Sequence, residues 1–309
     1  MESLTARTTF GTWGTLLLPI DDKDRIEWNA LGEEIDLLIA AGLSGIYSNG
    51  TAGEFHNQRE EEFDRVCSIL ADQCNRASMP FQIGASAPNP TISLERLRRA
   101  RKFVPGAFQV ILPDWFPVND REMVSFLARM AEEAAPIPLV LYNPPHAKRR
   151  LDAAGFDAIL DEIPALIGIK VADGDERWYQ SMRPVMDKCS VFVPGHHLAT
   201  GVAAGARGSY SNVACLNPAA AQRWYRKMLD DPGAAAELES RICTFMAESI
   251  APFISEKGYS NGAADKLLAA VGGWGPVGTR LRWPYESIPA EVVPGIRTRG
   301  HQIIPEFFE

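Results

Sequence analysis

Eight short apolar segments alternate with amphipathic segments along most of the chain, and this alternation limits the possible folds more than any other feature. The apolar segments have the length of buried strands, and most segments between them carry apolar residues at helical spacing. Strands that alternate with helices form right-handed βαβ units and a parallel sheet. Eight units favour a (β/α)8 barrel, in the α/β class, over an open doubly wound sheet. The predicted strands are 14–19, 45–49, 81–85, 108–112, 139–143, 166–171, 191–194 and 208–213.

The pattern becomes helical after residue 217. Predicted helices in this region cover residues 218–229, 234–250 and 262–271, and the proline-rich end, residues 283–309, is expected to be an extended wrap. We therefore divide the chain into a (β/α)8 barrel over residues 1–215 and a C-terminal helical extension and tail over residues 216–309. Helices between the barrel strands are expected at 28–41, 60–74, 93–103, 121–133 and 153–162.

Composition narrows the function classes. The chain has 309 residues, of which 46% are hydrophobic, and a formal net charge of −8 without a long basic run. Nucleic acid and anionic membrane surfaces are therefore not expected as partners. No apolar stretch reaches the ~18 residues of a membrane span, and the N-terminus lacks the apolar core of a signal peptide, so we expect a cytoplasmic protein. The five dispersed cysteines predict neither a disulfide framework nor a structural zinc site.

Lys170 ends the apolar segment that begins at Leu166. A lysine at the end of a buried strand holds its amine in a poorly solvated place, and desolvation favours the neutral, nucleophilic amine. Schiff-base chemistry with a carbonyl substrate requires such an amine. The alternative is a lysine whose stem packs while its ammonium reaches water. Polar residues at the ends of other predicted strands favour the catalytic interpretation.

Reactive side chains of a barrel come from the C-terminal ends of its strands. After the second strand, Gly50 and Gly53 allow a tight turn whose amides, with the Thr51 hydroxyl, can bind a carboxylate. An ordinary βα turn explains the same residues equally well. Tyr142 ends the fifth strand and can exchange a proton with a carbonyl oxygen, although half-buried core tyrosines are common.

The seventh strand is followed by Gly195 and two adjacent histidines, His196 and His197. Histidines in this position can be acid/base groups or simple polar loop residues. A histidine pair can also bind a metal ion, but no third ligand with recognisable spacing accompanies this one. The sequence therefore does not predict a metal site.

Three of these segments, in their order and spacing, resemble the dihydrodipicolinate synthase / N-acetylneuraminate lyase family. They are GTAGE at 50–54, YNPP at 142–145 and IGIK at 167–170, and the segment RLRWP at 280–284 is similar to the family's Arg-Leu-Pro segment. The resemblance covers roughly residues 10 to 290. It implies a (β/α)8 barrel with a C-terminal helical extension, which usually assembles as a homotetramer, so we expect a homo-oligomer (tetramer or dimer).

The resemblance also implies class I aldolase chemistry without a metal or diffusible cofactor. Lys170 would form a covalent imine with the C2 carbonyl of a 2-oxo acid, typically pyruvate. Tyr142 would be the proton shuttle, and Thr51 would bind the carboxylate and relay protons. The backbone around Ala52 and Gly53 would complete the carboxylate site. The enamine formed from the imine would attack an aldehyde, or be released by C–C cleavage in the lyase direction.

The chain departs from the family pattern at several positions. Ala52 replaces the usual second threonine or serine of the carboxylate turn, and Asp114 and Trp115 replace the paired tyrosines after the fourth strand. Ala147 stands where the synthase has the arginine that binds its second substrate. Trp115 has only an N–H donor and cannot accept and return a proton as tyrosine does. These differences argue against synthesis of dihydrodipicolinate, while the imine-forming residues remain.

Aromatic residues are expected near the mouth of the barrel. Trp115, Phe55, Phe116 and Tyr210 would give a pocket apolar surface for an aromatic or bulky aldehyde or a sugar acid; packing between subunits is the alternative. Trp115, Gly195 and Tyr210 are thus predicted to bind substrate, together with Ala52 and Gly53.

We expect a Schiff-base-forming lyase that makes or breaks a C–C bond between a 2-oxo acid and an aldehyde. One alternative is a dehydratase of a 2-keto-3-deoxy sugar acid that uses the same imine, and another is dihydrodipicolinate synthase itself. A barrel that binds an oxo acid without turnover would need neither Lys170 nor Tyr142. A phosphate-binding barrel would need a glycine-rich loop after the seventh or eighth strand, whereas residues 205–208 precede the eighth.

Overall fold

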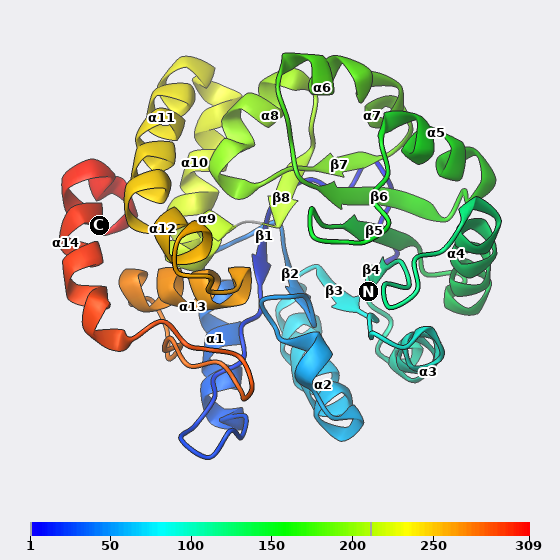
Figure 1. Cartoon of the computed structure of the whole chain (residues 1–309), viewed down its shortest axis with the longest axis horizontal. Helices are drawn as coiled ribbons and strands as arrows, with labels where there is room; N and C mark the ends of the chain where they lie inside the picture. The colour runs from blue at the N-terminus through cyan, green and yellow to red at the C-terminus, as the bar shows by residue number, and fades with distance from the viewer. Residues whose placement is uncertain (1, 211) are drawn as a thin grey trace.

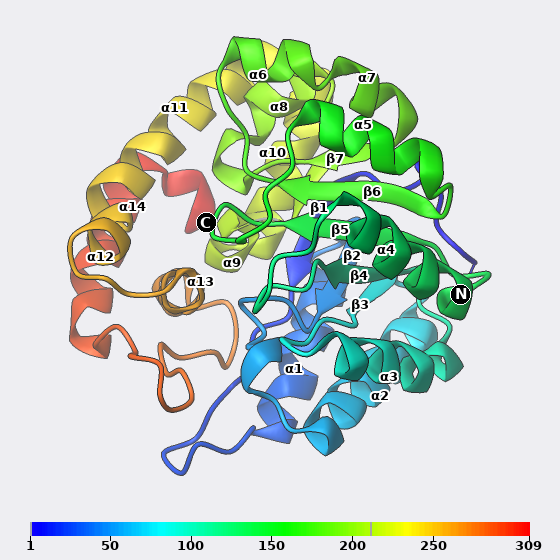
Figure 2. The same cartoon turned by 45° about the vertical axis from the view of Figure 1, so that its right-hand side comes forward.

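The computed structural model describes residues 2–210 and 212–309, and its centre is a closed barrel of eight parallel strands in sequence order (Figures 1 and 2). Strands β1 and β8 close the barrel by pairing in parallel, with Gly11 opposite Gly208. A Cβ atom on Gly208 would lie 2.2 Å from the carbonyl oxygen of Gly11, so the closure requires glycine. The predicted (β/α)8 barrel is confirmed. The strands are β1 Gly11–Thr15, β2 Gly45–Ser48, β3 Phe81–Gly84, β4 Ala107–Ile111, β5 Leu139–Asn143, β6 Leu166–Val171, β7 Ser190–Phe192 and β8 Gly208–Tyr210.

The first and last strands differ from the prediction. Strand β1 begins at Gly11 rather than at residue 14, and Trp13 packs inside the barrel with Tyr47 and Tyr210. Residues 16–18, which we assigned to the strand, instead join the large cluster between barrel and helices. Strand β8 ends at Tyr210, and a short helix covers part of the segment predicted as strand; residue 211 of that segment lies outside the described residues.

Helices surround the barrel strands, as the alternating pattern predicts (Figure 1). They begin and end within a few residues of the predicted positions, and Ala153–Glu162 coincides with its prediction. Two short helices between β6 and β7 were not predicted. The helices of this part are α1 Trp28–Ala40, α2 Glu60–Ala77, α3 Pro90–Ala100, α4 Asp120–Ala134, α5 Ala153–Glu162, α6 Glu176–Ser181, α7 Arg183–Lys188 and α8 Leu198–Ala204.

The C-terminal helices gather on one side of the barrel, as both views show (Figures 1 and 2). Helix α13 packs against α9 and α14, and α11 packs against α10 and α14. The prediction of an extended tail is wrong for α14. Pro294 lies in the first turn of that helix, where proline is tolerated, and a Cβ atom on Gly300 would lie 2.3 Å from the Phe308 ring. The helices are α9 Asn212–Leu216, α10 Pro218–Asp230, α11 Pro232–Ser249, α12 Ala251–Ser255, α13 Asn261–Gly272 and α14 Val293–Ile303.

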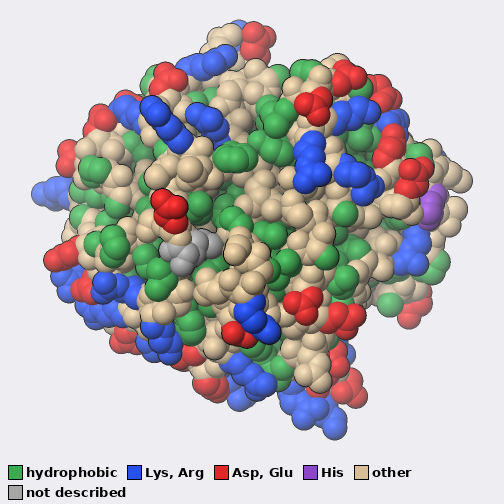
Figure 3. Space-filling model, turned by 180° about the vertical axis from the view of Figure 1, so that it is seen from behind, with side chains coloured by type: hydrophobic (Ala, Val, Ile, Leu, Met, Phe, Trp, Pro, Cys, Tyr) green, Lys and Arg blue, Asp and Glu red, His purple; other side chains and the backbone are tan. Residues whose placement is uncertain are grey.

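Dividing the chain at residue 215 remains a prediction; helices α9 and α10 both pack against β1. Within the described residues, no helix is both long and apolar enough to cross a membrane. On the face seen in Figure 3, basic side chains are interspersed with acidic ones.

Candidate active site

Lys170 lines a cavity of about 600 Å³ at the C-terminal ends of the strands. Pairing of β5 with β6 places it beside Tyr142. Its Nζ atom is 4.2 Å from the centre of the Tyr142 ring, 5.3 Å from that of Tyr210 and 5.7 Å from that of Tyr47. Burial lowers the pKa of Lys170 below its usual value, since desolvation disfavours the ammonium. The amine is therefore suited to act as a nucleophile.

The turn after β2 has a strained backbone on both sides. Asn49 and Glu54 both adopt left-handed conformations, with φ of 55° and 52°. Between them, a Cβ atom on Gly50 would lie 2.2 Å from the Tyr47 hydroxyl, and one on Gly53 would lie 3.0 Å from the carbonyl oxygen of Leu16. Strain of this kind persists where the surroundings impose it, and it is common at functional sites.

This turn presents polar groups to the cavity. Thr51 and Ala52 line it, and within the described residues no hydrogen bond engages the amides of Ala52 and Gly53. Burial raises the pKa of the Tyr142 phenol to about 12, and a hydrogen bond with Thr51 acts in the opposite direction. Thr51 thus influences the proton affinity of Tyr142, and the neighbouring amides of Ala52 and Gly53 can donate hydrogen bonds to an anion.

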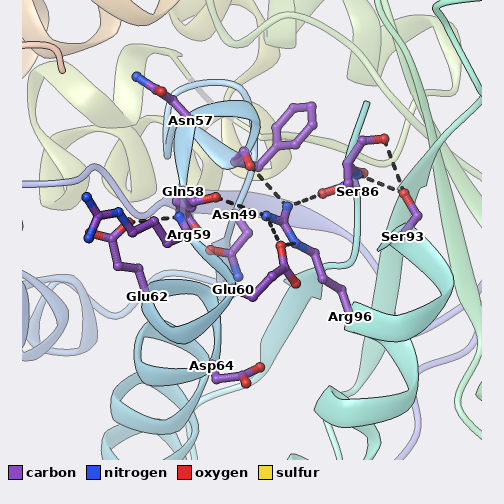
Figure 4. Close-up of polar contacts among 12 residues, drawn as sticks. Asn49, Asn57, Gln58, Arg59, Glu60, Glu62, Asp64, Ser86, Ser93 and Arg96 are labelled. Carbon is purple, nitrogen blue, oxygen red and sulfur yellow. Dashed lines mark hydrogen bonds and ion pairs between the residues drawn. The ribbon is translucent and has the colours of Figure 1, made fainter. Parts of the chain in front are cut away.

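Arg96 on α3 supports the turn from outside the barrel (Figure 4). Its buried guanidinium donates to the carbonyl oxygens of Phe55 and Ser86 at 3.0 and 2.6 Å, and it forms an ion pair with Glu60 on α2. Because the planar group contacts several carbonyls at once, it fixes the segment after the turn to the loop after β3.

Glu54 braces the turn from the other side, through a buried ion pair with Lys266 of α13. The Lys266 ammonium also donates to the carbonyl oxygen of Arg280, and the second Glu54 oxygen accepts from the backbone N–H of Arg282. The C-terminal extension and the turn after β2 therefore hold each other in place.

The structure brings together most of the residues predicted to form the site. Six of them line the Lys170 cavity: Thr51, Ala52, Tyr142, Lys170, Gly195 and Tyr210. Gly53 lies in the same turn as Thr51 and Ala52 but does not line the cavity, and its carbonyl oxygen accepts a hydrogen bond from the Gln58 side chain. The Tyr210 hydroxyl is turned toward Gln82 inside the barrel, at 2.5 Å, so Tyr210 offers the cavity its ring.

The structure does not bring Trp115 to the cavity. Its side chain is 78% exposed in the loop after β4, and its ring packs against the Lys148 ammonium at 5.0 Å. Asp114 of the same loop accepts from the backbone N–H of Lys148, which ties this loop to the one after β5. Phe116 is similarly exposed.

A second cavity of about 580 Å³ adjoins the first, because Thr51, Tyr142, Ile254 and Asn261 line both. Phe55, His56, His146 and Tyr285 contribute to its walls. Among the described residues that line the two cavities, Lys170 is the single lysine or arginine. The second cavity therefore suits a neutral group better than a carboxylate or phosphate.

The histidines after β7 line the wall of the first cavity. His197 Nδ1 lies 2.9 Å from Asp173, which raises the pKa of His197. Burial, together with the neighbouring His197, lowers the pKa of His196 to about 4, and its Nδ1 bonds to the Asn212 amide. No cluster of three or more potential metal ligands is found in the described part of the chain.

Asp265 of α13 lines the Lys170 cavity, and the sequence analysis missed it. Burial raises the pKa of its carboxyl, and the charge of Lys170 opposes this rise. In the surrounding segment, Ala263 to Ala270, every residue except Asp265 and Lys266 is apolar. Two adjacent charges on a buried helix are the signal that could have indicated a role for this residue.

Comparisons with known proteins agree with this geometry. Residues 9–257 match the sequence model described as the dihydrodipicolinate synthetase family. The chain is 28% identical to a 4-hydroxy-tetrahydrodipicolinate synthase of Methanothrix thermoacetophila over 71% of this chain and 74% of that protein. It is 24% identical to an N-acetylneuraminate lyase of Rhizobium meliloti over 64% and 66% of the two chains. A prophage protein of the dihydrodipicolinic acid synthase family from E. coli K12, solved with pyruvate, has a similar fold, with a TM-score of 0.83, 20% identity and coverage of 96% and 98%.

Proposed function

The chain belongs to the dihydrodipicolinate synthetase family, and we propose that it is a Schiff-base-forming lyase that acts on a 2-oxo acid such as pyruvate. One observation carries the proposal: the amine of Lys170 lies 4.2 Å from the centre of the Tyr142 ring in a cavity that both residues line, and burial lowers the pKa of the amine. A neutral amine next to a proton-donating phenol is the arrangement that imine formation needs.

In the proposed reaction, the carboxylate of the oxo acid binds the Thr51 hydroxyl and the amides of Ala52 and Gly53. The Lys170 nitrogen forms a bond to C2 while the carbonyl π pair moves to oxygen, which takes a proton from Tyr142. The added nitrogen returns one of its protons to Tyr142, and Tyr142 passes this proton to the new hydroxyl. The hydroxyl leaves as water while the nitrogen lone pair forms the C2=N bond of the cationic imine, and the Tyr142 phenolate that remains is reprotonated from water. The imine nitrogen is the electron sink, so the reaction as proposed uses no diffusible cofactor.

The enamine derived from this imine would then attack an aldehyde, or would be the product of C–C cleavage in the reverse direction. The adjoining cavity, which Thr51 and Tyr142 share, would hold the aldehyde. Since Lys170 is the single lysine or arginine among the described lining residues, we propose an aldehyde whose distal part carries no carboxylate or phosphate. Lys148, Arg149 and Arg150 are the candidates to replace the arginine missing at Ala147, but none of them lines either cavity. Lys148 donates to the carbonyl oxygen of Trp115, and Arg149 pairs with Asp120.

Two further parts of the proposal concern the protein's context. We propose a homo-oligomer, a tetramer or dimer, in which the exposed rings of Trp115 and Phe116 would be covered. We also propose a cytoplasmic location. The five cysteines, which all lie within the described residues, form no disulfide, and this supports the proposal.

Product analysis tests the reaction. The protein would be incubated with pyruvate and a panel of aromatic, aliphatic and hydroxylated aldehydes, with pyruvate and the carboxylate-bearing aldehyde of the synthase reaction, and separately with a 2-keto-3-deoxy sugar acid. Products would be identified by NMR and mass spectrometry. We expect a new C–C bond with an uncharged aldehyde. A dehydrated or decarboxylated oxo acid from a 2-keto-3-deoxy sugar acid would support the dehydratase alternative. Formation of 4-hydroxy-tetrahydrodipicolinate would support the synthase alternative and contradict the proposed neutral aldehyde.

A further inference from the structure

Asp265 and Lys170 are two opposite charges that face one cavity without a direct bond. Both side chains line the cavity and both are half-buried. Within residues 2–210 and 212–309, neither a hydrogen bond nor an ion pair engages the Asp265 carboxylate. A carboxylate without a partner in a poorly solvated place destabilises the fold. Groups of this kind are common at functional sites, where their chemistry accounts for their presence. The cavity that both groups line has a volume of about 600 Å³, which is large enough to hold an oxo acid.

The position of Asp265 is firmly set. Its neighbour Lys266 is held by Glu54 at 2.7 Å and by the carbonyl oxygen of Arg280 at 2.5 Å. At the start of the same helix, a Cβ atom on Gly262 would lie 3.6 Å from the carbonyl oxygen of Thr51. Helix α13 is therefore packed on the turn that would bind the substrate carboxylate, and Asp265 faces the substrate from the extension.

We propose that Asp265 is a catalytic residue that exchanges a proton with the substrate carbon next to the imine on Lys170. This inference rests on the proposed function and adds a residue to it. In the forward step, the C3–H bond breaks and its electron pair forms the C2=C3 bond. The C2=N π pair returns to nitrogen, and the proton goes to the Asp265 carboxylate. In the reverse step, Asp265 returns the proton to C3.

Charge balance supports this role. The cationic imine and the Asp265 carboxylate carry opposite charges, whereas the enamine and a protonated Asp265 are both neutral. The net charge of the cavity thus stays constant while the proton moves, so no charge is left unpaired in a site of low polarity.

Most of the other titratable groups near the pair keep one protonation state near neutral pH. Burial raises the pKa of Tyr47, Tyr142, Tyr210 and Cys215, which keeps these phenols and this thiol protonated. Burial lowers the pKa of His196 to about 4, which keeps that ring neutral. Lys266 is paired with Glu54. His197 also lines the cavity, but its Nδ1 lies 2.9 Å from the Asp173 carboxylate, which raises the pKa of this ring and engages its proton. Among the described groups named here, Lys170 and Asp265 are therefore the two without such a partner that can exchange a proton with the substrate.

The test compares two reactions of the full chain with pyruvate. Borohydride trapping measures the imine, and exchange of the pyruvate methyl protons in D2O, followed by NMR, measures proton transfer at C3. In Asp265→Asn we expect trapping to persist while exchange falls by at least about 100-fold. Asp265→Glu should restore part of the exchange. Because Asp265 makes no hydrogen bond within the described residues, the asparagine variant should melt no lower than the wild type.

The pH dependence adds a measurement that a structural role would not change. The Asp265 charge raises the pKa of Lys170, so Asp265→Asn should shift the half-maximal pH of trapping downward. Asp72→Asn, the same charge change on an exposed face of α2, should leave both reactions unchanged.

Three outcomes would overturn the inference. The first is proton exchange by Asp265→Asn within about threefold of wild type, because this change is too small for a lost acid/base group. The second is loss of trapping in the folded Asp265→Asn variant. The third is an equal effect of the Asp72→Asn control on both reactions. Failure of the proposed function is distinguishable, because then the wild type itself would not be trapped.

Discussion

The Nζ atom of Lys266 lies 2.7 Å from Oε1 of Glu54, and the side-chain exposures of the two residues are 0% and 3%. This ion pair joins α13 to the turn after β2, and so it links the C-terminal extension to the site. Asp265 precedes Lys266 on the same helix, and Thr51 precedes Glu54 in the same turn. The pair therefore fixes two parts of the proposed site at once.

Loss of one member of this pair should destabilise the fold. Lys266→Met leaves the Glu54 carboxylate buried without its cation, which we expect to lower the free energy of unfolding by about 3–5 kcal/mol. Chemical denaturation would measure it. Arg76→Met breaks an ion pair with Asp72 whose side chains are both 69% exposed, and should cost about 1 kcal/mol or less. Similar losses in the two variants would contradict the assigned importance of the buried pair.

Tyr142→Phe should slow imine formation, because the variant keeps the ring beside Lys170 and removes the proton donor. We expect the rate of borohydride trapping with pyruvate to fall by about 10²–10⁴-fold. The thermal unfolding midpoint is the control for folding. Trapping at the wild-type rate would remove Tyr142 from the mechanism.

Imine formation should depend on pH through the Lys170 amine. Burial lowers the pKa of this amine below the usual 10.5, and the neutral form increases as the pH rises through that pKa. The trapping rate should therefore rise with pH and level off below pH 10.5. A rate that still rises there would show that the amine is as solvated as that of a surface lysine.

Trp115→Ala should have little effect on imine formation, since the side chain is 78% exposed and lies outside both cavities. We expect a trapping rate within about twofold of wild type, as for most surface substitutions. Measuring the aldehyde preference of the same variant would test the earlier prediction that Trp115 binds substrate. A changed preference would restore that role, through a rearrangement or a second subunit.

Much of the barrel could be predicted because its signal is local. Alternating apolar and amphipathic segments indicate strands and helices wherever they occur, and strand β6 with Lys170 near its end was located without error. The prediction failed where apolar residues of a strand are followed directly by apolar residues of a loop. Leu16, Leu17 and Leu18 continue the apolar pattern beyond β1, although they pack outside the barrel. Proline and glycine in α14 concealed a helix that tertiary packing stabilises.

The site was predicted where residues follow a strand, and missed where they do not. Lys170, Tyr142 and Thr51 all come from the ends or loops of strands, so the barrel rule brings them to one edge. Asp265 comes from a helix almost 100 positions later, and nothing local to it indicates which cavity it faces. Trp115 follows a strand as well, but its loop is tied by Asp114 and Lys148 to the next loop and turns outward.

Borohydride reduction in the presence of pyruvate, followed by peptide mass spectrometry, tests the central claim most directly. We predict a reduced pyruvoyl adduct on Lys170 in the wild-type protein and no adduct in a folded Lys170→Ala variant. An adduct on another lysine, or none on folded wild-type protein with pyruvate or longer 2-oxo acids, would contradict the proposed Schiff-base chemistry.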